Sequence, residues 1–400
     1  VNNGGTSAES SIESGLATFF RDHPESARSG IIVAFSGGID SSVLLAALTS
    51  MAAKASKAAE ANRGLSPFRA VHVVHNLRDP EELRRERSLV RDSCRKLGVP
   101  LTIAVIKAGS VERVAFEKGI GEEAAACELR YGILKREARR FGIGTICTAH
   151  NADDQLETMI GRFLSSSSID GLAGIPQLRT IGEKLLLARP LLFASRKQIE
   201  NYAAEKNLVF STDSSNASTE FFRNRIRHCL VPILESEFPG WRKGILGTRE
   251  KLGLDKVEIG ENFERAMLSC TIDRSQKEAH FPFATFMESS DSLRIRILAA
   301  CIGAVSGGER LSFKALRNAS ISLASGAKRL DVLGARLLLD NGQLSILSIL
   351  DFKREDGYFF QVESEGTYRA GDVVVSLCWA APGGHKSRQT KAPEKGKGYL

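Results

Sequence analysis

The stretch that decides the fold is Val33-Ala34-Phe35-Ser36-Gly37-Gly38-Ile39-Asp40-Ser41-Ser42-Val43-Leu44-Leu45. Its apolar beginning is typical of a buried strand, and its apolar end, which follows small polar residues, is typical of a helix. The two glycines between them let the backbone turn tightly and approach a bound anion closely. Because the first N–H groups of a helix carry the positive end of its dipole, they attract phosphate. The stretch therefore predicts a phosphate-binding loop between a strand and a helix.

We expect the loop to bind phosphate through a run of consecutive residues: Ser36, Gly37, Gly38, Ile39, Asp40, Ser41 and Ser42. The run has neither the Lys-Ser or Lys-Thr pair of a Walker A loop nor the G-x-G-x-x-G pattern of a dinucleotide fingerprint. The simpler alternative, a Ser/Gly turn before an ordinary N-cap, accounts for only part of it. Asp40 would repel a nucleotide unless a cation lay between them, so we expect it to hold Mg²⁺ or to fix the pyrophosphate geometry. The alternative is a plain carboxylate in the first helical turn.

Short apolar runs alternate with helical patterns through the first part of the chain. The runs are residues 31–35, 70–74, 101–106 and 145–149, and the helical patterns include residues 80–97 and 122–141. Such runs, rich in β-branched and small apolar residues, are typical of strands buried on both faces. Their alternation with helices predicts an α/β fold with a doubly wound parallel sheet.

The pattern changes beyond this sheet domain, which we expect to span residues 1–240. A mostly helical stretch predicts a second, helical domain at residues 241–328. Alternating apolar residues predict a small β-rich C-terminal unit at residues 329–400. Its last fifteen residues carry five basic side chains and one acidic one, so we expect a solvated basic tail, with a role in gripping RNA as the alternative.

Composition narrows the class of protein. With 400 residues, 42% hydrophobic and 26% charged, the chain can bury real cores in two or three domains. No run approaches the roughly 20 apolar residues of a membrane helix, and the first residues lack the pattern of a signal peptide, so we expect a soluble, cytoplasmic protein with no membrane partner. The seven cysteines include no Cys-x-x-Cys pair, which disfavours structural zinc and a disulfide framework. The net charge of +8 permits a nucleic acid partner.

The motifs resemble those of known families. Residues 36–41 (SGGIDS) resemble the SGGxDS loop of the PP-loop ATP pyrophosphatase superfamily, whose members split ATP into AMP and pyrophosphate. Residues 72–78 (HVVHNLR), 123–131 (EAAACELRY) and 149–158 (AHNADDQLET) are similar to the HVDHGLR, E-x-x-AR-x-x-RY and AHHADDQxET segments of the tRNA(Ile)-lysidine synthase family. Residues 171–176, 189–192, 213–216 and 223–227 resemble that family's GLAGI, RPLL, DxSN and RNRIR motifs in the same order. The resemblance is continuous over residues 31–239.

The resemblance implies an adenine nucleotide alpha hydrolase-like fold and a ligase that uses ATP and Mg²⁺. Such an enzyme adenylates C2 of the wobble cytidine, position 34, in the CAU anticodon of an isoleucine tRNA. The ε-amine of free L-lysine then displaces AMP, which gives lysidine and AUA decoding. The implied partners are this tRNA and L-lysine, and a homodimer is left open.

Residues after two strand ends are expected to carry the chemistry. Ligands of parallel sheets bind beyond the carboxyl ends of strands, so the segments after residues 74 and 149 point at one crevice. Two adjacent carboxylates can hold Mg²⁺ or can position and deprotonate the incoming amine, whose ammonium form has a pKa of about 10.4. We expect Asp154 to carry the chemistry and Asp153 to support it. We expect His150 to contact the nucleotide. The alternatives are that one aspartate only caps a helix and that His150 is a satisfied core residue.

Six basic residues are expected to contact RNA or substrate: His75, Arg78, Arg130, Arg223, Arg225 and Arg227. The three arginines in residues 223–227 are spaced to meet successive phosphates. The alternative for these three is a solvated basic face. The alternative for Arg130, with Tyr131, is a salt bridge on a helix face beside a core aromatic residue.

Several residues depart from the family pattern. Val74, Cys127 and Asn151 stand where that family has Asp, Arg and a second His, and further departures are Asn76, Thr212 and residues 165–168. The nearest rival function is that of a PP-loop tRNA thiolase, which uses an iron–sulfur cluster on Cys-x-x-Cys or a reactive cysteine with a resolving partner. The missing Cys-x-x-Cys disfavours it. The rival of another class is a nucleotide- or RNA-binding module without catalysis, which the intact loop and the Asp153-Asp154 pair disfavour.

Overall fold

Strand β1, Ile31–Ala34, is covered by side chains on both faces. Ile31 and Val33 belong to one hydrophobic core, and Ile32, which points to the opposite face, belongs to another. A strand whose every residue is apolar needs such double cover. The structure is a computed structural model that describes residues 8–58, 68–75, 79–165, 168–211, 222–306, 312–332 and 334–349, together with four short strands nearer the C-terminus.

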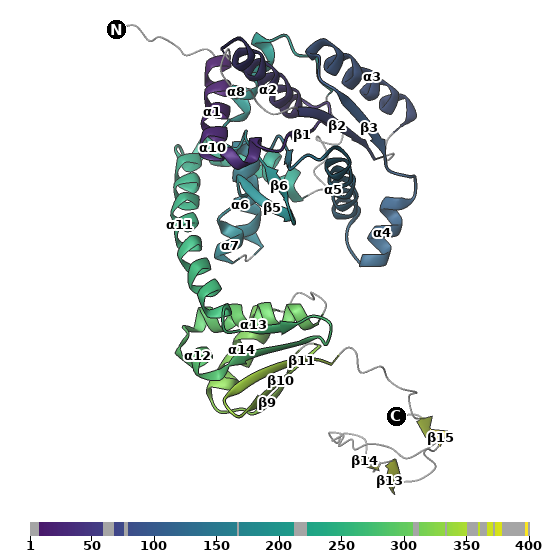
Figure 1. Ribbon diagram of the computed structural model, residues 1–400, viewed down its shortest axis with the longest axis vertical. Coiled ribbons are helices and arrows are strands. Elements are labelled where there is room, and N and C mark those ends of the chain that lie inside the picture. The colour runs from purple at the N-terminus through teal and green to yellow at the C-terminus, as the bar shows by residue number, and fades with distance from the viewer. Residues whose placement is uncertain are drawn as a thin grey trace. The chain divides into compact units, whose positions relative to one another are not determined.

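The first sheet has six strands in the order β3-β2-β1-β4-β6-β5 (Figure 1). The other five are β2 Phe68–Val74, β3 Leu101–Val105, β4 Thr145–Cys147, β5 Leu178–Gly182 and β6 Leu185–Ala188. Neighbouring strands run parallel except β5 and β6, which are antiparallel. The predicted α/β fold with a doubly wound, mainly parallel sheet is therefore confirmed.

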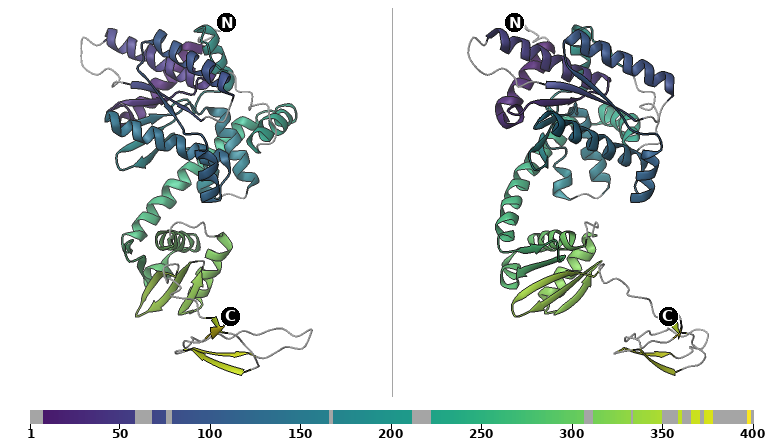
Figure 2. Two further views of the ribbon diagram at one scale, coloured as in Figure 1. Left: turned by 90° about the vertical axis from the view of Figure 1, so that its right-hand side faces the viewer. Right: turned by 45° about the vertical axis from the view of Figure 1, so that its right-hand side comes forward.

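Helices lie on both faces of this sheet (Figure 2). Its helices are α1 Ala8–Asp22, η1 Pro24–Ala27, α2 Ile39–Ala58, α3 Pro80–Leu97, α4 Ser110–Lys118, α5 Glu122–Phe141, α6 Ala152–Leu164, α7 Ile169–Leu172 and α8 Arg196–Glu205. Helices α1, α2 and α8 bury their apolar residues on one side, and α5 packs on the other. After α8 the chain forms α9 Phe222–Arg225, the π-helical turn η3 Ile226–Leu230, α10 Val231–Glu237 and α11 Trp241–Met267.

The sheet reverses its direction of winding between β1 and β4. From β1 the chain proceeds to β2 and β3 on one side, and it returns to place β4 on the other side of β1. In open α/β sheets, a ligand crevice forms beyond the carboxyl ends of the strands at such a switch point. The loop that follows β1 and the segment that follows β4 both lie there.

The chain divides into two compact units, Val1–Val257 and Glu258–Leu400. The second unit has a five-stranded antiparallel sheet in the order β7-β8-β11-β10-β9. Its strands are β7 Thr271–Asp273, β8 Glu278–Pro282, β9 Arg329–Val332, β10 Ala335–Asp340 and β11 Gln343–Ser348. Its helices are α12 Phe283–Glu288, α13 Asp291–Val305 and α14 Phe313–Ala324, and these share one core with the sheet. The short strands β12 Phe359–Phe360, β13 Gly366–Ala370, β14 Val373–Leu377 and β15 Lys397–Gly398 follow.

This division differs from the domain boundaries expected from the sequence. The two units meet within helix α11, at residues 257 and 258, whereas the expected boundary at residue 240 lies just before this helix begins. Strands β7 and β8 lie in residues 241–328, expected to be helical, and β8 pairs with β11 from residues 329–400. Local periodicity did not reveal this pairing because the two strands are distant in sequence.

Some expectations fall outside the described residues, namely Arg78, residues 213–216 and most of the basic tail. Within the described ranges, no helix is both long and apolar enough to cross a bilayer.

Candidate active site

The loop after β1 is shaped by its own serines. Gly37 has a φ of +85°, and a Cβ there would lie 3.1 Å from Cγ2 of Val90, so the position requires glycine. The hydroxyls of Ser41 and Ser42 each donate to the carbonyl of Gly38 at 3.0 Å. These two hydroxyls were expected to donate to phosphate, and in the structure they hold the turn. The anion-binding capacity of the loop therefore rests on backbone N–H groups at the start of α2.

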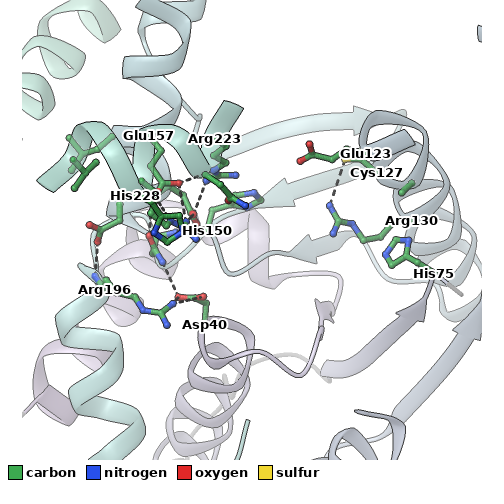
Figure 3. Close-up of a pocket in the computed structure, with 18 of the residues that line it drawn as sticks. Asp40, His75, Glu123, Cys127, Arg130, His150, Glu157, Arg196, Arg223 and His228 are labelled. Carbon is green, nitrogen blue, oxygen red and sulfur yellow. Dashed lines mark hydrogen bonds and ion pairs between the residues drawn. The ribbon is translucent and has the colours of Figure 1, made fainter. Parts of the chain in front are cut away.

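Beside the loop lies a cavity of about 1110 Å³ (Figure 3). Eight of the expected site residues line it: Asp40, His75, Arg130, His150, Asp153, Asp154, Arg223 and Arg227. The remaining loop residues and Arg225 do not line it. Figure 3 shows two groups in this space, with Asp40, His150, Glu157 and Arg223 on one side and His75, Glu123, Cys127 and Arg130 on the other. The crevice predicted from the strand ends thus brings together residues of α2, α5, α6 and α9 and residues that follow β2 and β4.

Helix α6 begins with a reciprocal cap. The side-chain oxygen of Asn151 accepts the backbone N–H of Asp154 at 3.0 Å, and the carboxylate of Asp154 accepts the backbone N–H of Asn151 at 2.9 Å. The amide nitrogen of Asn151 also donates to Oδ1 of Asp40 at 2.8 Å. The N-cap of α6 is therefore Asn151, and Asp154 completes the reciprocal cap through Oδ2, which leaves its Oδ1 for another partner.

Three carboxylates on α6 are paired with three arginines from the end of the first unit. Arg223 bonds Asp154 at 2.7 Å and Glu157 at 2.8 Å, and Arg227 bonds Glu157 at 2.6 Å. Arg242 bonds Asp153. We call these six residues the α6 ion-pair cluster: Asp153, Asp154, Glu157, Arg223, Arg227 and Arg242. Arg223 and Arg227 were expected to face RNA phosphates, and here they face carboxylates.

Glu157 and Arg242 are cluster members that sequence reasoning missed. Glu157 is buried, and it follows Asp153 and Asp154 at helical spacing, so all three can point to one side of α6. That spacing was a usable signal for Glu157. Arg242 gives no such signal, because its partner Asp153 is 89 residues away in the sequence.

Burial changes the protonation of two residues near the cluster. Burial, reinforced by the guanidinium groups of Arg189 and Arg223, lowers the pKa of His150 to about 3. The ring is therefore neutral at pH 7, and its Nδ1 lies 2.9 Å from the hydroxyl of Thr148. Burial also raises the pKa of Asp154, against the opposing charge of Arg223. A neutral imidazole and a carboxylate with raised pKa are suited to contacting a nucleotide and accepting a proton, respectively.

The other side of the cavity contains two departures from the family pattern. Cys127 lies half-buried, and Nη2 of Arg130 is 3.6 Å from its sulfur. Val74 is buried at the end of β2 and forms part of the cavity wall. An arginine and an aspartate are therefore replaced here by a thiol and an apolar side chain, which leaves Arg130 as a basic group on this wall beside His75.

Asp40 is the residue expected to hold Mg²⁺. Its carboxylate accepts from Asn151 and from Arg196, the latter at 3.2 Å, and its side chain is 31% exposed. In the described ranges, no group of three or more His, Cys, Asp or Glu residues is arranged to hold a metal ion. Mg²⁺ typically takes one or two carboxylates together with substrate phosphates. The single carboxylate of Asp40 therefore fits a Mg²⁺ ion that binds together with the phosphates of a nucleotide.

Known proteins resemble this chain in sequence. Residues 8–234 match the family described as the PP-loop domain. The tRNA(Ile)-lysidine synthase of Porphyromonas gingivalis is 36% identical over 262 residues, which cover 63% of this chain and 52% of that protein. The enzyme of the same name from Borreliella burgdorferi is 29% identical over 289 residues, 72% of this chain and 60% of that protein. The chain thus spans about half the length of the curated relatives it matches.

Among solved structures, the U34-tRNA thiolase NcsA from Methanococcus maripaludis, described with its 4Fe-4S cluster, aligns with a TM-score of 0.48 at 16% identity. The alignment covers 60% of this chain and 78% of that chain.

Proposed function

The chain belongs to the PP-loop domain family, and we propose that it ligates L-lysine to C2 of the wobble cytidine in an isoleucine tRNA with a CAU anticodon. The observation that carries this proposal is the cavity beside the loop, in which Asp40, His150 and Asp154 line one space. The curated relatives named tRNA(Ile)-lysidine synthase support the choice of substrates. ATP is the implied nucleotide, and AMP and pyrophosphate are the implied products.

In the first step, the loop binds the phosphates of ATP through backbone N–H groups at the start of α2. Mg²⁺ bound with the nucleotide would be held by Asp40 and would offset the charge of the pyrophosphate leaving group. The neutral ring of His150 contacts the nucleotide or the cytidine base without adding charge. C2 of the cytidine is activated through the oxygen it carries, which becomes linked to AMP.

In the second step, Asp154 takes a proton from the ε-ammonium group of lysine so that the amine can attack C2 and release AMP. The raised pKa of Asp154 makes it a better proton acceptor than an ordinary carboxylate. Its Oδ1 is bonded to Arg223, so this ion pair has to open first. A phosphate group of the RNA or of the nucleotide can compete with Asp154 for the guanidinium group of Arg223 and so open the ion pair.

Sulfur transfer is the weaker alternative. Among the described residues, Cys127 is the cysteine that lines the cavity, and no second thiol lies there to resolve a sulfur intermediate. Cys147 is fully buried in β4, and burial raises the pKa of its thiol to about 12. A thiol of that pKa is not ionised at pH 7 and is a poor nucleophile.

The test is incorporation of radiolabelled lysine into an isoleucine tRNA with a CAU anticodon, in the presence of ATP and Mg²⁺. The control is the same tRNA with the wobble C replaced by U. ATP-dependent labelling that requires the C is the expected result. If ATP is cleaved only in the presence of tRNA but the tRNA is not labelled, ATP and tRNA remain the substrates and a nucleophile other than lysine attacks the RNA.

A further inference from the structure

Asn151 connects the two halves of the site across the switch point between β1 and β4. Its amide nitrogen donates to Asp40, which follows β1, and its side-chain oxygen caps α6 at the backbone N–H of Asp154, which follows β4. A single buried side chain, 4% exposed, therefore contacts both segments that supply carboxylates to the cavity.

Only one orientation of the Asn151 amide satisfies both neighbours. The backbone N–H of Asp154 can only donate, and an ionised Asp40 carboxylate can only accept. The amide oxygen must therefore face α6, and the amide nitrogen must face Asp40. The helix cap fixes the direction of the donor, and burial keeps water from competing for it.

The second group that holds Asp40 is less firmly placed. The side chain of Arg196 is 45% exposed, its contacts with Asp40 are 3.2 and 3.4 Å long, and it also bonds Glu200 at 2.8 Å. A half-exposed arginine with two carboxylate partners can leave one of them at small cost. Asn151 cannot leave Asp40 without also disturbing the start of α6.

We propose that Asn151 is a positioning residue that holds the Asp40 carboxylate in a fixed relation to Asp154, at a position where the family that the sequence resembles has histidine. This inference rests on the proposed function, in which Asp40 acts during the step that forms pyrophosphate. The loop backbone holds the ATP phosphates independently of Asn151. Loss of the amide donor therefore slows the chemical step more than it weakens ATP binding.

The test separates the amide donor from the helix cap. Asn151→Ser keeps an oxygen that can cap α6 but has no N–H₂ group to reach Asp40, and Asn151→Ala lacks both. The control is Ser312→Ala, which removes the cap of α14 in the second unit, where the Ser312 hydroxyl accepts the N–H of Ala315 at 3.2 Å. Each variant of the full chain is measured for Tm and for kcat and KM of tRNA-dependent pyrophosphate release.

We expect Asn151→Ser to keep the wild-type KM for ATP and to lower Tm only by the lost hydrogen bond to Asp40, while kcat falls about 10- to 100-fold, as it does when a reacting group is slightly misplaced. Asn151→Ala should show the same loss of kcat and also a Tm lower by about 2–4 °C from the lost cap. Ser312→Ala should lower Tm without changing kcat. A serine variant with wild-type kcat would limit Asn151 to capping α6 and overturn the proposal.

Failure of the proposed function gives a different result. A wild-type protein that releases no pyrophosphate with tRNA would overturn that function. The hydrogen bond between Asn151 and Asp40 can still be tested, through its effect on Tm. Asn151→Ser, Asp40→Ala and the double variant form a cycle in which the double variant should lose less than the sum of the single losses. Additive losses would mean that the two side chains are not coupled and would overturn the inference without reference to activity.

Discussion

The loop of residues 36–42 and the α6 ion-pair cluster lie at one cavity but are built in opposite ways. The serine hydroxyls of the loop form hydrogen bonds with residues at most five positions away. The cluster joins residues 66 to 89 positions apart through charges. Its three guanidinium groups are matched by three carboxylates.

This difference indicates which groups at the cavity can bind an anion without first breaking another interaction. The loop serines bond their own backbone and leave helix N–H groups to meet phosphate. The cluster arginines are already neutralised, so they reach a phosphate only when an ion pair opens. A basic motif in a sequence therefore does not by itself show that its arginines are free to contact phosphate.

The largest expected effect is at Asp40, where the loop meets the segment that begins α6. Asp40→Asn keeps an oxygen for Asn151 but removes the charge that offsets Mg²⁺, so lysine incorporation should fall about 10²- to 10³-fold, as for loss of one preorganised electrostatic contact. Tm should stay within a few degrees. Glu200→Gln, which breaks the other ion pair of Arg196, is the matched control and should keep its activity. Full activity of Asp40→Asn would remove Asp40 from the chemistry.

The next effect tests whether the cluster supports the fold. Glu157 is 4% exposed and bonds both Arg223 and Arg227, so Glu157→Gln removes a buried counter-charge that the two guanidinium groups share. The free energy of unfolding should fall by about 2–3 kcal/mol, less than for a fully buried pair because the arginine side chains are 42% and 37% exposed.

Urea unfolding measures this loss, and the control is Glu235→Gln, which removes an exposed partner of Arg242. That variant should lose less than about 1 kcal/mol. Equal losses for the two variants would mean that burial does not distinguish the cluster from a surface ion pair.

The contrast between local and long-range contacts also explains which features could be predicted from the sequence alone. Strand β1, the loop and α2 follow from residues that are neighbours in the chain, so their positions were predictable. The segments after β2 and β4 were placed at one crevice by the general rule for parallel sheets. The partners of Arg223 and Arg227 depend on how residues 222–242 pack against α6, and no local pattern contains that information. The same holds for the pairing of β8 with β11 in the second unit.

The backbone of the loop gives the next prediction. Gly37→Ala forces a side chain into the left-handed region and against Val90, which should cost about 2 kcal/mol of stability. Gly98→Ala is the matched control, because Gly98 also has a positive φ of +67° but an added Cβ meets nothing within 4 Å. Its expected cost is about 1 kcal/mol.

Gly38→Ala sharpens this test of the loop. A Cβ there meets only the Ser36 hydroxyl at 3.5 Å, so the stability measured by urea unfolding should not change. The methyl group should obstruct the approach of phosphate and raise the Kd for ATP, measured by calorimetry. Unchanged ATP affinity would show that phosphate does not approach the loop backbone at Gly38.

Beside the cluster, His150 predicts a pH dependence. An unfolded chain protonates this histidine below about pH 6.5, whereas the folded protein keeps it neutral down to about pH 3. Between these values stability should fall as pH falls, by up to about 1.4 kcal/mol per pH unit. Asp154 has the opposite effect on stability, because burial raises its pKa in the folded protein. Its contribution to the free energy of unfolding is present at low pH and is lost as the pH rises through the pKa of the folded protein.

His150→Gln isolates the histidine from this opposing effect. Stability is measured by urea unfolding from pH 7 to pH 4 for the wild type and the variant. The variant should lose less stability on acidification. Parallel curves would mean that the folded protein protonates His150 as readily as the unfolded chain does.

The smallest expected effect concerns Arg225, which is exposed and does not line the cavity. Its guanidinium lies 5.7 Å from the ring of Phe222, in contrast to Arg223 and Arg227, which bond carboxylates. If Arg225 meets one RNA phosphate, Arg225→Gln should reduce the slope of log K against log salt for tRNA binding by about 0.7–0.9, with Tm unchanged. Arg21→Gln, at an exposed residue of α1 that pairs with Asp22, is the control. A wild-type slope for Arg225→Gln would remove Arg225 from the phosphate contacts, and the cluster arginines could make such contacts only after their ion pairs open.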